Sequence, residues 1–265
     1  KIQIPFNNAN ALEQALDPDV AAVILETVPS TLGMVMPVSG YLKRVRELCD
    51  HNGTLLIMDE VQSGLGRTGK LWAFEHAGIT PDMVILGKGL SGGIYPISAT
   101  VIREPLDAIF KRDPFIHIST YGGSELGCRV AKKVVQISSD PHFLERVQEA
   151  GHKVREGLDI IQKNYPKFFT GIRQTGLMIG LELRDEYGGP ALTKTAYDED
   201  LLMIYANNDT SVSQFLPPLT ITNEEIDLVM EKLDRAMNAA RKLRTVIMAK
   251  EKSSGFLKLF SGKDN

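Results

Sequence analysis

The stretch Thr54–Gly93, "TLLIMDEVQSGLGRTGKLWAFEHAGITPDMVILGKGLSGG", contains two short apolar runs that each lead to a charged residue. "TLLIM" is followed directly by Asp59, and "MVIL" is followed by Lys88, which lies between two glycines. Short apolar runs bounded by turn residues are typical of buried strands. Lysine is among the residues least often buried, so a lysine at the end of a core strand needs a functional explanation.

Similar runs occur on both sides of this stretch. "VAAVILE" ends on Glu26, and "ISATVI" follows the glycine turn. Strands buried on both faces and separated by helices predict an α/β domain with a largely parallel sheet. In such sheets the functional groups gather at the carboxyl ends of the strands. We therefore expect Glu26, Asp59 and Lys88 at one edge of the sheet.

Apolar periodicity predicts one helix before the first of these strands and one between the first and the second. "NALEQAL" reads as a short helix with Asn10 as its N-cap. Between Gly40 and Gly53 one helical stripe is apolar, and Gly53 is expected to end that helix in the left-handed conformation. The stripe consists of Leu42, Val45, Leu48 and Cys49.

The pattern changes after about residue 138, which predicts three regions. Residues 1–138 are expected to form part of a large domain, 139–246 a smaller α+β domain, and 247–265 a flexible tail. In the second region "SSDPHFLERV" starts a long helix, while "GIRQTG" and "LMIGLEL" are strand-like. Thr222 and Glu225 predict a capping box at the start of the final helix.

Composition and charge narrow the class of protein. A net charge of -3 gives no reason to expect nucleic acid or an anionic membrane as partner. No apolar run approaches the roughly 20 residues of a membrane span. Cys49 and Cys128 lie far apart and the five histidines show no ligand spacing, so we expect no metal and a reduced, cytoplasmic compartment. The first residue is not methionine, so the sequence is expected to begin within a longer protein.

Two strand-end residues carry the candidate chemistry. Lys88 can attack a carbonyl to form a Schiff base where its surroundings disfavour the ammonium form. Asp59 can hold a protonated ring nitrogen and keep a pyridinium electron sink charged. Val61 shares a face with Asp59 if the chain stays extended, and Gln62 can donate to a ring oxygen. The alternatives are a solvated surface lysine and a carboxylate that caps a helix or closes a loop.

The segment Leu55–Ile102 resembles the central segment of the class III aminotransferases, the pyridoxal-phosphate enzymes that include ornithine, acetylornithine and 4-aminobutyrate aminotransferases. "GYLKRVRELCDHNG", "STYGGSELGCRVAKKVV" and "FLPPLTITNEEID" also match, and the match covers most of residues 20–237 in the family's order. The resemblance implies fold-type I. That fold has a mainly parallel sheet with helices on both faces and a smaller C-terminal α+β domain.

The resemblance also implies a role for each matching residue. Lys88 forms the Schiff base with pyridoxal 5′-phosphate and shuttles the proton. Asp59 pairs with the pyridine nitrogen, Val61 packs on the ring, and Gln62 reaches the ring hydroxyl oxygen. Thr120 binds the cofactor phosphate of the neighbouring subunit, which implies a homodimer with shared sites.

The activity that the resemblance implies is transfer of an amino group from an ω-amino donor to a 2-oxo acid. The donor is ornithine-, acetylornithine-, 4-aminobutyrate- or diamine-like. Two alternatives stay open: a decarboxylase or aminomutase of the same fold, and a truncated, non-catalytic binding subunit. A Schiff-base aldolase without cofactor is disfavoured, because Asp59 and Thr120 would then have no purpose.

The sequence departs from the family in two ways. The family's phosphate-binding loop and its ring-stacking aromatic residue lie upstream of this sequence. The N-terminal part of the fold is therefore expected to be absent, either because the sequence is a fragment or because another chain supplies it.

The second departure concerns substrate. "ETVPST" places Thr31 where many members have glutamate, and "SQFLPPL" places Gln214 where they have the arginine that takes a substrate carboxylate. Either the pocket is changed or another basic residue takes over. Glu26 matches the family's first glutamate and is expected behind the residues that touch substrate.

Overall fold

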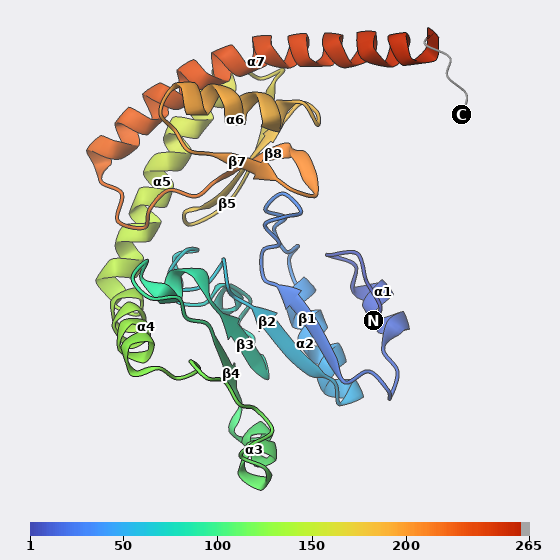
Figure 1. The fold of residues 1–265 in the computed structure, drawn as a ribbon, viewed down its shortest axis with the longest axis vertical. Helices are drawn as coiled ribbons and strands as arrows, with labels where there is room; N and C mark the ends of the chain where they lie inside the picture. Colours follow the sequence, from blue (N-terminus) through green and yellow to red (C-terminus); the bar gives the residue numbers. More distant parts are fainter. Residues whose placement is uncertain (261–265) are drawn as a thin grey trace. The chain divides into compact units, whose positions relative to one another are not determined.

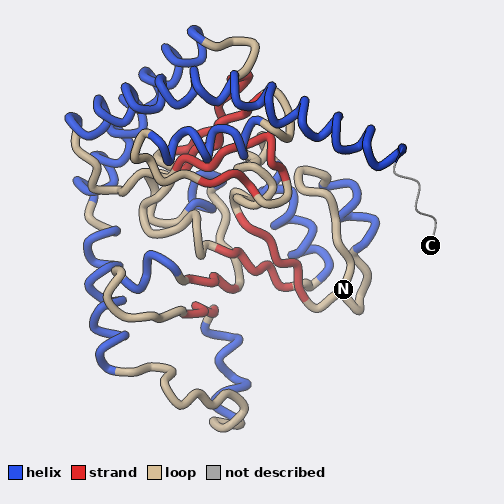
Figure 2. The backbone as a smooth tube through the Cα atoms, turned by 45° about the horizontal axis from the view of Figure 1, so that its top comes forward, coloured by secondary structure: helices blue, strands red, loops and turns tan. Residues whose placement is uncertain are grey.

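The structure, a computed structural model, describes residues 1–260, with side chains through residue 250. The chain forms two compact units, and their helices and strands are drawn in Figures 1 and 2. Unit 1 consists of Lys1–Pro29 and Met36–Gln148. Unit 2 consists of Ser30–Val35 and the residues from Glu149 onward.

Unit 1 is built on a four-stranded sheet with the order β1-β2-β3-β4. Its first three strands are parallel, and β4 is antiparallel to β3. The prediction of a largely parallel sheet is therefore confirmed. The strands are β1 (Ala22–Glu26), β2 (Leu55–Asp59), β3 (Met83–Leu86) and β4 (Ala99–Ile102).

The two helices predicted in unit 1 are both present, and one of their caps differs from the prediction. Gly53 ends α2 with a φ of 71°, as expected of a left-handed glycine. Asn8, and not Asn10, caps α1, because its side chain accepts a hydrogen bond from the amide of Ala11 at 2.9 Å. The helical segments are α1 (Ala9–Ala15), α2 (Tyr41–Asn52), η1 (Ala73–Ala77), η2 (Lys88–Ser91), η3 (Glu104–Asp107), α3 (Ala108–Arg112) and α4 (Glu125–Ser138).

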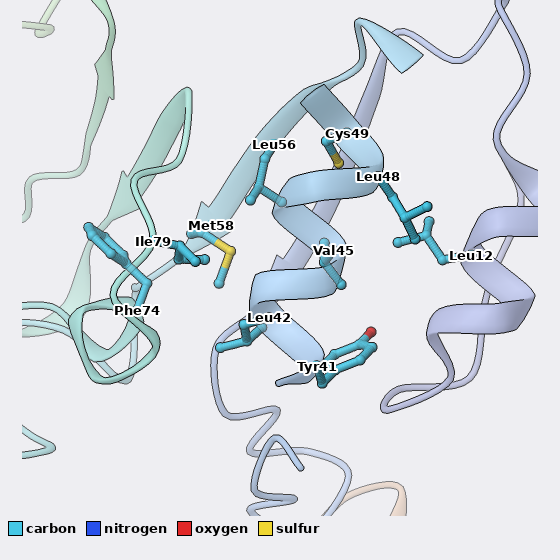
Figure 3. Close-up of a cluster of buried hydrophobic side chains, with 10 residues drawn as sticks. All are labelled: Leu12, Tyr41, Leu42, Val45, Leu48, Cys49, Leu56, Met58, Phe74 and Ile79. Carbon is cyan, nitrogen blue, oxygen red and sulfur yellow. The ribbon is translucent and has the colours of Figure 1, made fainter. Parts of the chain in front are cut away.

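The main apolar cluster of unit 1 lies between α2 and one face of the sheet. Figure 3 shows Val45 and Cys49 of α2 with Leu56 and Met58 of β2 in this cluster. Burial alternates along β2 and along the first four residues of β1, and Ile24 of β1 is 61% exposed. The expected burial of these strands on both faces is therefore not found in the described chain, because one set of alternating side chains has little packed against it.

A buried carboxylate fixes β3 relative to β2 and α2. Asp82, directly before β3, accepts hydrogen bonds from the amide of Leu56 at 2.8 Å, from Arg46 at 2.7 Å and from Arg103 at 3.0 Å. Burial opposes ionisation of Asp82, but these hydrogen bonds outweigh it and lower its pKa. The start of β3, and with it the approach to Lys88, is held by this ionic cluster.

Unit 2 contains an antiparallel sheet with the order β5-β6-β8-β7. Helices α6 and α7 pack together, and Thr195 of α6 donates a hydrogen bond to the carbonyl of Ala236 in α7 at 2.9 Å. The elements are α5 (Pro141–Asn164), β5 (Phe169–Thr175), β6 (Met178–Leu183), α6 (Gly188–Asp198), β7 (Ile204–Ala206), β8 (Asp209–Phe215) and α7 (Asn223–Phe260).

The division between the two units and the length of α7 both differ from the expected regions. The expected boundary at 138/139 lies just before α5, whereas the two units divide within this continuous helix, after Gln148. Helix α7 opens with the predicted capping box, since Thr222 and Glu225 exchange hydrogen bonds of 2.8 and 3.2 Å. It continues through residue 247, where a flexible tail is expected, to Phe260, and the rest of that tail lies outside the described residues.

Among the described helices, none has the length and apolar character needed to cross a membrane.

Candidate active site

The carboxyl ends of the first three strands bring the strand-end residues to one edge of unit 1. In the parallel register Glu26 of β1 pairs with Asp59 of β2, and Asp59 pairs with Ile85 of β3. Lys88 follows β3 after one glycine. The structure therefore places Glu26, Asp59 and Lys88 at one edge of the sheet, as the alternation of strands and helices predicts.

Lys88 lies at the start of a tight turn and contacts Gln62. Its Nζ donates a hydrogen bond to Oε1 of Gln62. Its φ of 43° is left-handed, which is a strained conformation for a residue other than glycine and is often found at functional sites. The side chain is exposed in the described chain. Buried surroundings for this side chain are therefore not found among the described residues.

Asp59 uses one carboxylate oxygen to close the turn that follows β2. Oδ1 accepts a hydrogen bond from the amide of Val61 at 2.9 Å, which is the loop-closing role that the sequence left open. Oδ2 has no hydrogen-bond donor among the described residues. One oxygen therefore holds the turn while the other stays available to a ligand.

Val61 is placed at the site by a turn, and not by the extended strand that the sequence suggested. The strand ends at Asp59 and the chain turns from Val61 onward, so the alternation of an extended strand does not place Val61. Its methyl groups instead lie against Gly87, where an added Cβ would be 3.4 Å from Cγ1 of Val61. The turn thus brings an apolar side chain next to the backbone that leads to Lys88.

Glu60 is a residue of the site region that sequence reasoning missed. It is 2% exposed, and its carboxylate accepts hydrogen bonds from Thr27 at 2.5 Å, from Ser63 at 2.9 Å and from the amides of Ala73 and Phe74 at 2.9 and 3.1 Å. Burial raises the pKa of Glu60, and these hydrogen bonds offset only part of the rise. The available signal was the strand alternation, which turns Glu60 away from the Asp59 side and toward the core.

Thr120 is not brought to the other candidates by the structure. It is exposed, and no hydrogen bond or ion pair within the described chain involves it. It lies in the segment between α3 and α4, which Figure 1 shows running from α3 back to α4. Phe115, Ile118 and Tyr121 of the same segment are 78%, 72% and 80% exposed.

Thr31 and Gln214 both belong to unit 2. Thr31 lies in Ser30–Val35, which we call the strap, and its carbonyl accepts a hydrogen bond from the amide of Asn208 at 2.9 Å. Gln214 pairs with Gly180 across β8 and β6. A Cβ added to Gly180 would be 2.9 Å from Cβ of Met34, so the strap lies against this part of the sheet. The structure therefore brings the segment of Thr31 and the strand of Gln214 together.

Comparison with known proteins identifies the family. Residues 2–237 match the sequence profile described as "Aminotransferase class-III". The chain belongs to the class III aminotransferases. An uncharacterized aminotransferase of Archaeoglobus fulgidus is 50% identical over 246 residues, which are 93% of this chain and 58% of that protein.

Solved structures agree with this family and confirm the predicted fold-type I class. An ornithine aminotransferase from Toxoplasma gondii matches with a TM-score of 0.83 and 33% identity over 91% of this chain and 56% of that one. An N-acetylornithine aminotransferase from Stenotrophomonas maltophilia matches with a TM-score of 0.79 and 35% identity over 89% and 61%. The chain thus spans about three fifths of the length of these relatives.

Membership of the family implies pyridoxal 5′-phosphate as cofactor, and the Toxoplasma structure contains this cofactor at partial occupancy in its active site. The side chains at the sheet edge fit it chemically. Lys88 supplies a primary amine for an aldehyde, and Oδ2 of Asp59 is available to a protonated ring nitrogen. Val61 supplies an apolar surface beside Gly87.

Proposed function

We propose that the complete protein is a pyridoxal-phosphate-dependent aminotransferase. It moves an amino group from an ω-amino donor, such as an ornithine-, acetylornithine-, 4-aminobutyrate- or diamine-like compound, to a 2-oxo acid. The observation that carries this proposal is the placement of Lys88, Gln62 and Asp59 together at the carboxyl edge of the sheet, in a chain of this family. Both cysteines are free thiols, which supports a cytoplasmic enzyme.

Each side chain at the edge has a separate task in this proposal. The bound cofactor supplies an electron sink when the carbon that carries the amino group loses its proton. Lys88 tethers the cofactor through its Nζ and moves that proton. Asp59 keeps the ring nitrogen protonated through Oδ2, while Oδ1 stays on the amide of Val61. Gln62 reaches the ring hydroxyl oxygen, Val61 packs on the ring, and Glu26 lies behind them.

The exposed segment around Thr120 supports a homodimer with shared sites. Monomeric proteins rarely expose large contiguous apolar patches, and such patches often mark interfaces. Phe115, Ile116, Ile118 and Tyr121 are each at least half exposed on the segment that carries Thr120. A second copy of the chain would cover these side chains, and Thr120 would bind the cofactor phosphate of that neighbour.

Chemical trapping tests the proposed function at its central residue. Borohydride reduction of the complete, cofactor-loaded protein, followed by peptide mapping, is expected to place a pyridoxyl group on Lys88. Lys70, an exposed lysine of the same unit, is the internal control and is expected to stay unlabelled. A label on another lysine, or no label at all, would contradict the proposal. Product analysis then separates amino transfer from decarboxylation or amino-group migration.

The pair Thr31 and Gln214 supports a specificity that differs from arginine-bearing relatives. An arginine fork holds a carboxylate bidentately, and glutamine cannot reproduce this contact. Loss of a hydrogen bond to a charged group typically costs about 1.5–3 kcal/mol, or roughly ten- to hundredfold in affinity. We therefore expect weak use of glutamate and 2-oxoglutarate, and better use of pyruvate or diamines.

Substitution of Gln214 by arginine tests this expectation. Gln214→Arg is expected to raise the specificity constant for 2-oxoglutarate by roughly tenfold relative to pyruvate, because Thr31 cannot neutralise the new charge. Gln214→Met, of similar length and without charge, is the control and should not show this preference. If the unmodified protein already prefers 2-oxoglutarate strongly and Gln214→Arg does not improve it, another residue binds the carboxylate.

A further inference from the structure

The strap (Ser30–Val35) crosses the sheet of unit 2 at a position that only glycine permits. An added Cβ at Gly180 would be 2.9 Å from Cβ of Met34, 3.1 Å from Cγ1 of Val212 and 3.2 Å from the carbonyl oxygen of Gly33. Met34 is fully buried at this place. The missing side chain of Gly180 therefore leaves the space in which Gly33 and Met34 lie.

Gly180 lies between two side chains that share its face of the sheet. Arg173 of β5 pairs with Gly180 of β6, and Gly180 pairs with Gln214 of β8. Directly paired residues on antiparallel strands project from the same face. The strap consequently passes over Gly180 between Arg173 on one side and Gln214 on the other.

Arg173 holds the strap by its backbone. Its Nε and Nη2 contact Oε1 of Glu182 at 2.7 and 2.5 Å, and its Nη1 donates to the carbonyl of Gly33 at 2.6 Å. Because the guanidinium is planar, the carboxylate of Glu182 that fixes two nitrogens also fixes the direction of the third. The ammonium of a lysine lacks this fork and cannot make the same set of contacts.

The strap needs such a hold, since its backbone is strained. Gly33 and Met34 have φ values of 90° and 54°. The left-handed region is unfavourable for methionine and persists only where the surroundings enforce it. A second backbone contact with the sheet region is the hydrogen bond from the amide of Asn208 to the carbonyl of Thr31 at 2.9 Å. Arg173, Gly180 and Asn208 thus each contribute to the position of the strap that carries Thr31.

We propose that Arg173 is a positioning residue for substrate specificity, which sets the place of Thr31 relative to Gln214 by holding the carbonyl of Gly33. This inference rests on the proposed function, because it assigns Thr31 and Gln214 to the acceptor pocket. Arg173 acts through the strap and does not itself touch substrate. Its loss should therefore change which acceptor is preferred and should leave the chemistry at Lys88 intact.

Hydrogen exchange of the complete protein tests the positioning directly. In Arg173→Leu the amide of Asn208 is expected to exchange roughly ten- to hundredfold faster, because the strap that supplies its acceptor is released. Arg173→Lys is expected to give an intermediate rate. Gly180→Ala should reproduce the release while keeping Arg173, since the new methyl group takes the place of the strap. If the rates stay unchanged in Arg173→Leu and Gly180→Ala, the positioning role is wrong.

Acceptor kinetics separate positioning from a merely structural role. Arg173→Leu and Gly180→Ala are each expected to shift the ratio of the specificity constants for 2-oxoglutarate and pyruvate by roughly fivefold or more, through KM rather than kcat. Arg235→Leu is the matched control, because it removes an arginine that pairs with Glu199 and Glu231 elsewhere in unit 2. It should change neither the exchange nor the ratio. Faster exchange with an unchanged ratio would overturn the specificity role.

If the proposed function were wrong, the experiments would give a different set of results from those that contradict the positioning role. The unmodified, cofactor-loaded protein would then transfer no amino group from any donor, while the exchange of Asn208 would still respond to Arg173→Leu and Gly180→Ala. In that case the strap is held as described, and its assigned role in choosing an acceptor is overturned.

Discussion

Replacing Lys88 by alanine in the complete protein is expected to lower turnover by roughly 10⁴-fold or more. A positioned acid–base group alone contributes about 10²–10⁴-fold, and the alanine variant also loses the covalent tether. Lys88 starts the turn after β3 with a left-handed φ of 43°, and its Nζ contacts Gln62. No other lysine follows a strand at this edge of the sheet in the described chain.

The measurement is the rate of amino transfer at saturating donor and acceptor, with the visible absorption of the cofactor followed in parallel. Lys70→Ala, which changes an exposed side chain in the loop after β2, is the control and should keep near-normal turnover. Thermal unfolding should show little change for either variant, because both side chains are exposed. A Lys88→Ala protein that retains more than about one hundredth of the turnover would remove Lys88 from the mechanism, because even the lower end of the acid–base contribution is about 10²-fold.

The residues at the carboxyl ends of the unit 1 strands could be predicted from the sequence, because short stretches of sequence identify each strand. Short apolar runs identify β2 and β3, and the parallel arrangement then places Asp59 and Lys88 together without further information. The caps of α2 and α7 were equally predictable, since Gly53, Thr222 and Glu225 act on residues close in sequence. These helix caps depend on interactions between residues close in sequence, so the sequence alone was enough to predict them.

The features that the sequence did not predict depend on contacts between distant residues. Glu60 takes its role from Thr27 and from the amides of η1, which are 13 to 33 residues away. The strap belongs to unit 2 because Arg173, 140 residues away, holds the carbonyl of Gly33. Neither contact leaves a periodic or compositional signal. The exposure of Ile24 was also missed, because an apolar run does not show how much of it the chain covers.

The buried carboxylate of Glu60 anchors the turn after β2, which carries Asp59 and Val61. Its carboxylate ties the end of β1, through Thr27, to the start of η1, through Ala73 and Phe74. Asp59 and Val61 lie on either side of it in the chain, so their positions follow from this anchoring. Residues that act at a site are most effective where buried partners of this kind hold them in place.

Replacing Asp59 by asparagine is expected to lower turnover by on the order of 10²–10³-fold, a range typical of losing one preorganised electrostatic contact. The substitution removes the negative charge that keeps the ring nitrogen protonated, so the electron sink weakens. The amide oxygen of asparagine can still accept the hydrogen bond that Oδ1 takes from Val61 at 2.9 Å. The turn should therefore survive, and cofactor affinity should fall much less than turnover.

Asp59→Ala is the matched comparison, because it removes both the charge and the acceptor for Val61. If charge is what matters for turnover, Asp59→Asn and Asp59→Ala lose turnover to a similar extent, whereas only Asp59→Ala lowers the Tm. Loss of that one hydrogen bond, worth about 1 kcal/mol, corresponds to roughly 2–4 °C in Tm for a chain of this size. The measurements are turnover, cofactor affinity by titration, and Tm. Near-normal turnover in Asp59→Asn together with a lowered Tm in Asp59→Ala would leave Asp59 as the residue that closes a turn, and the ring nitrogen would need another partner.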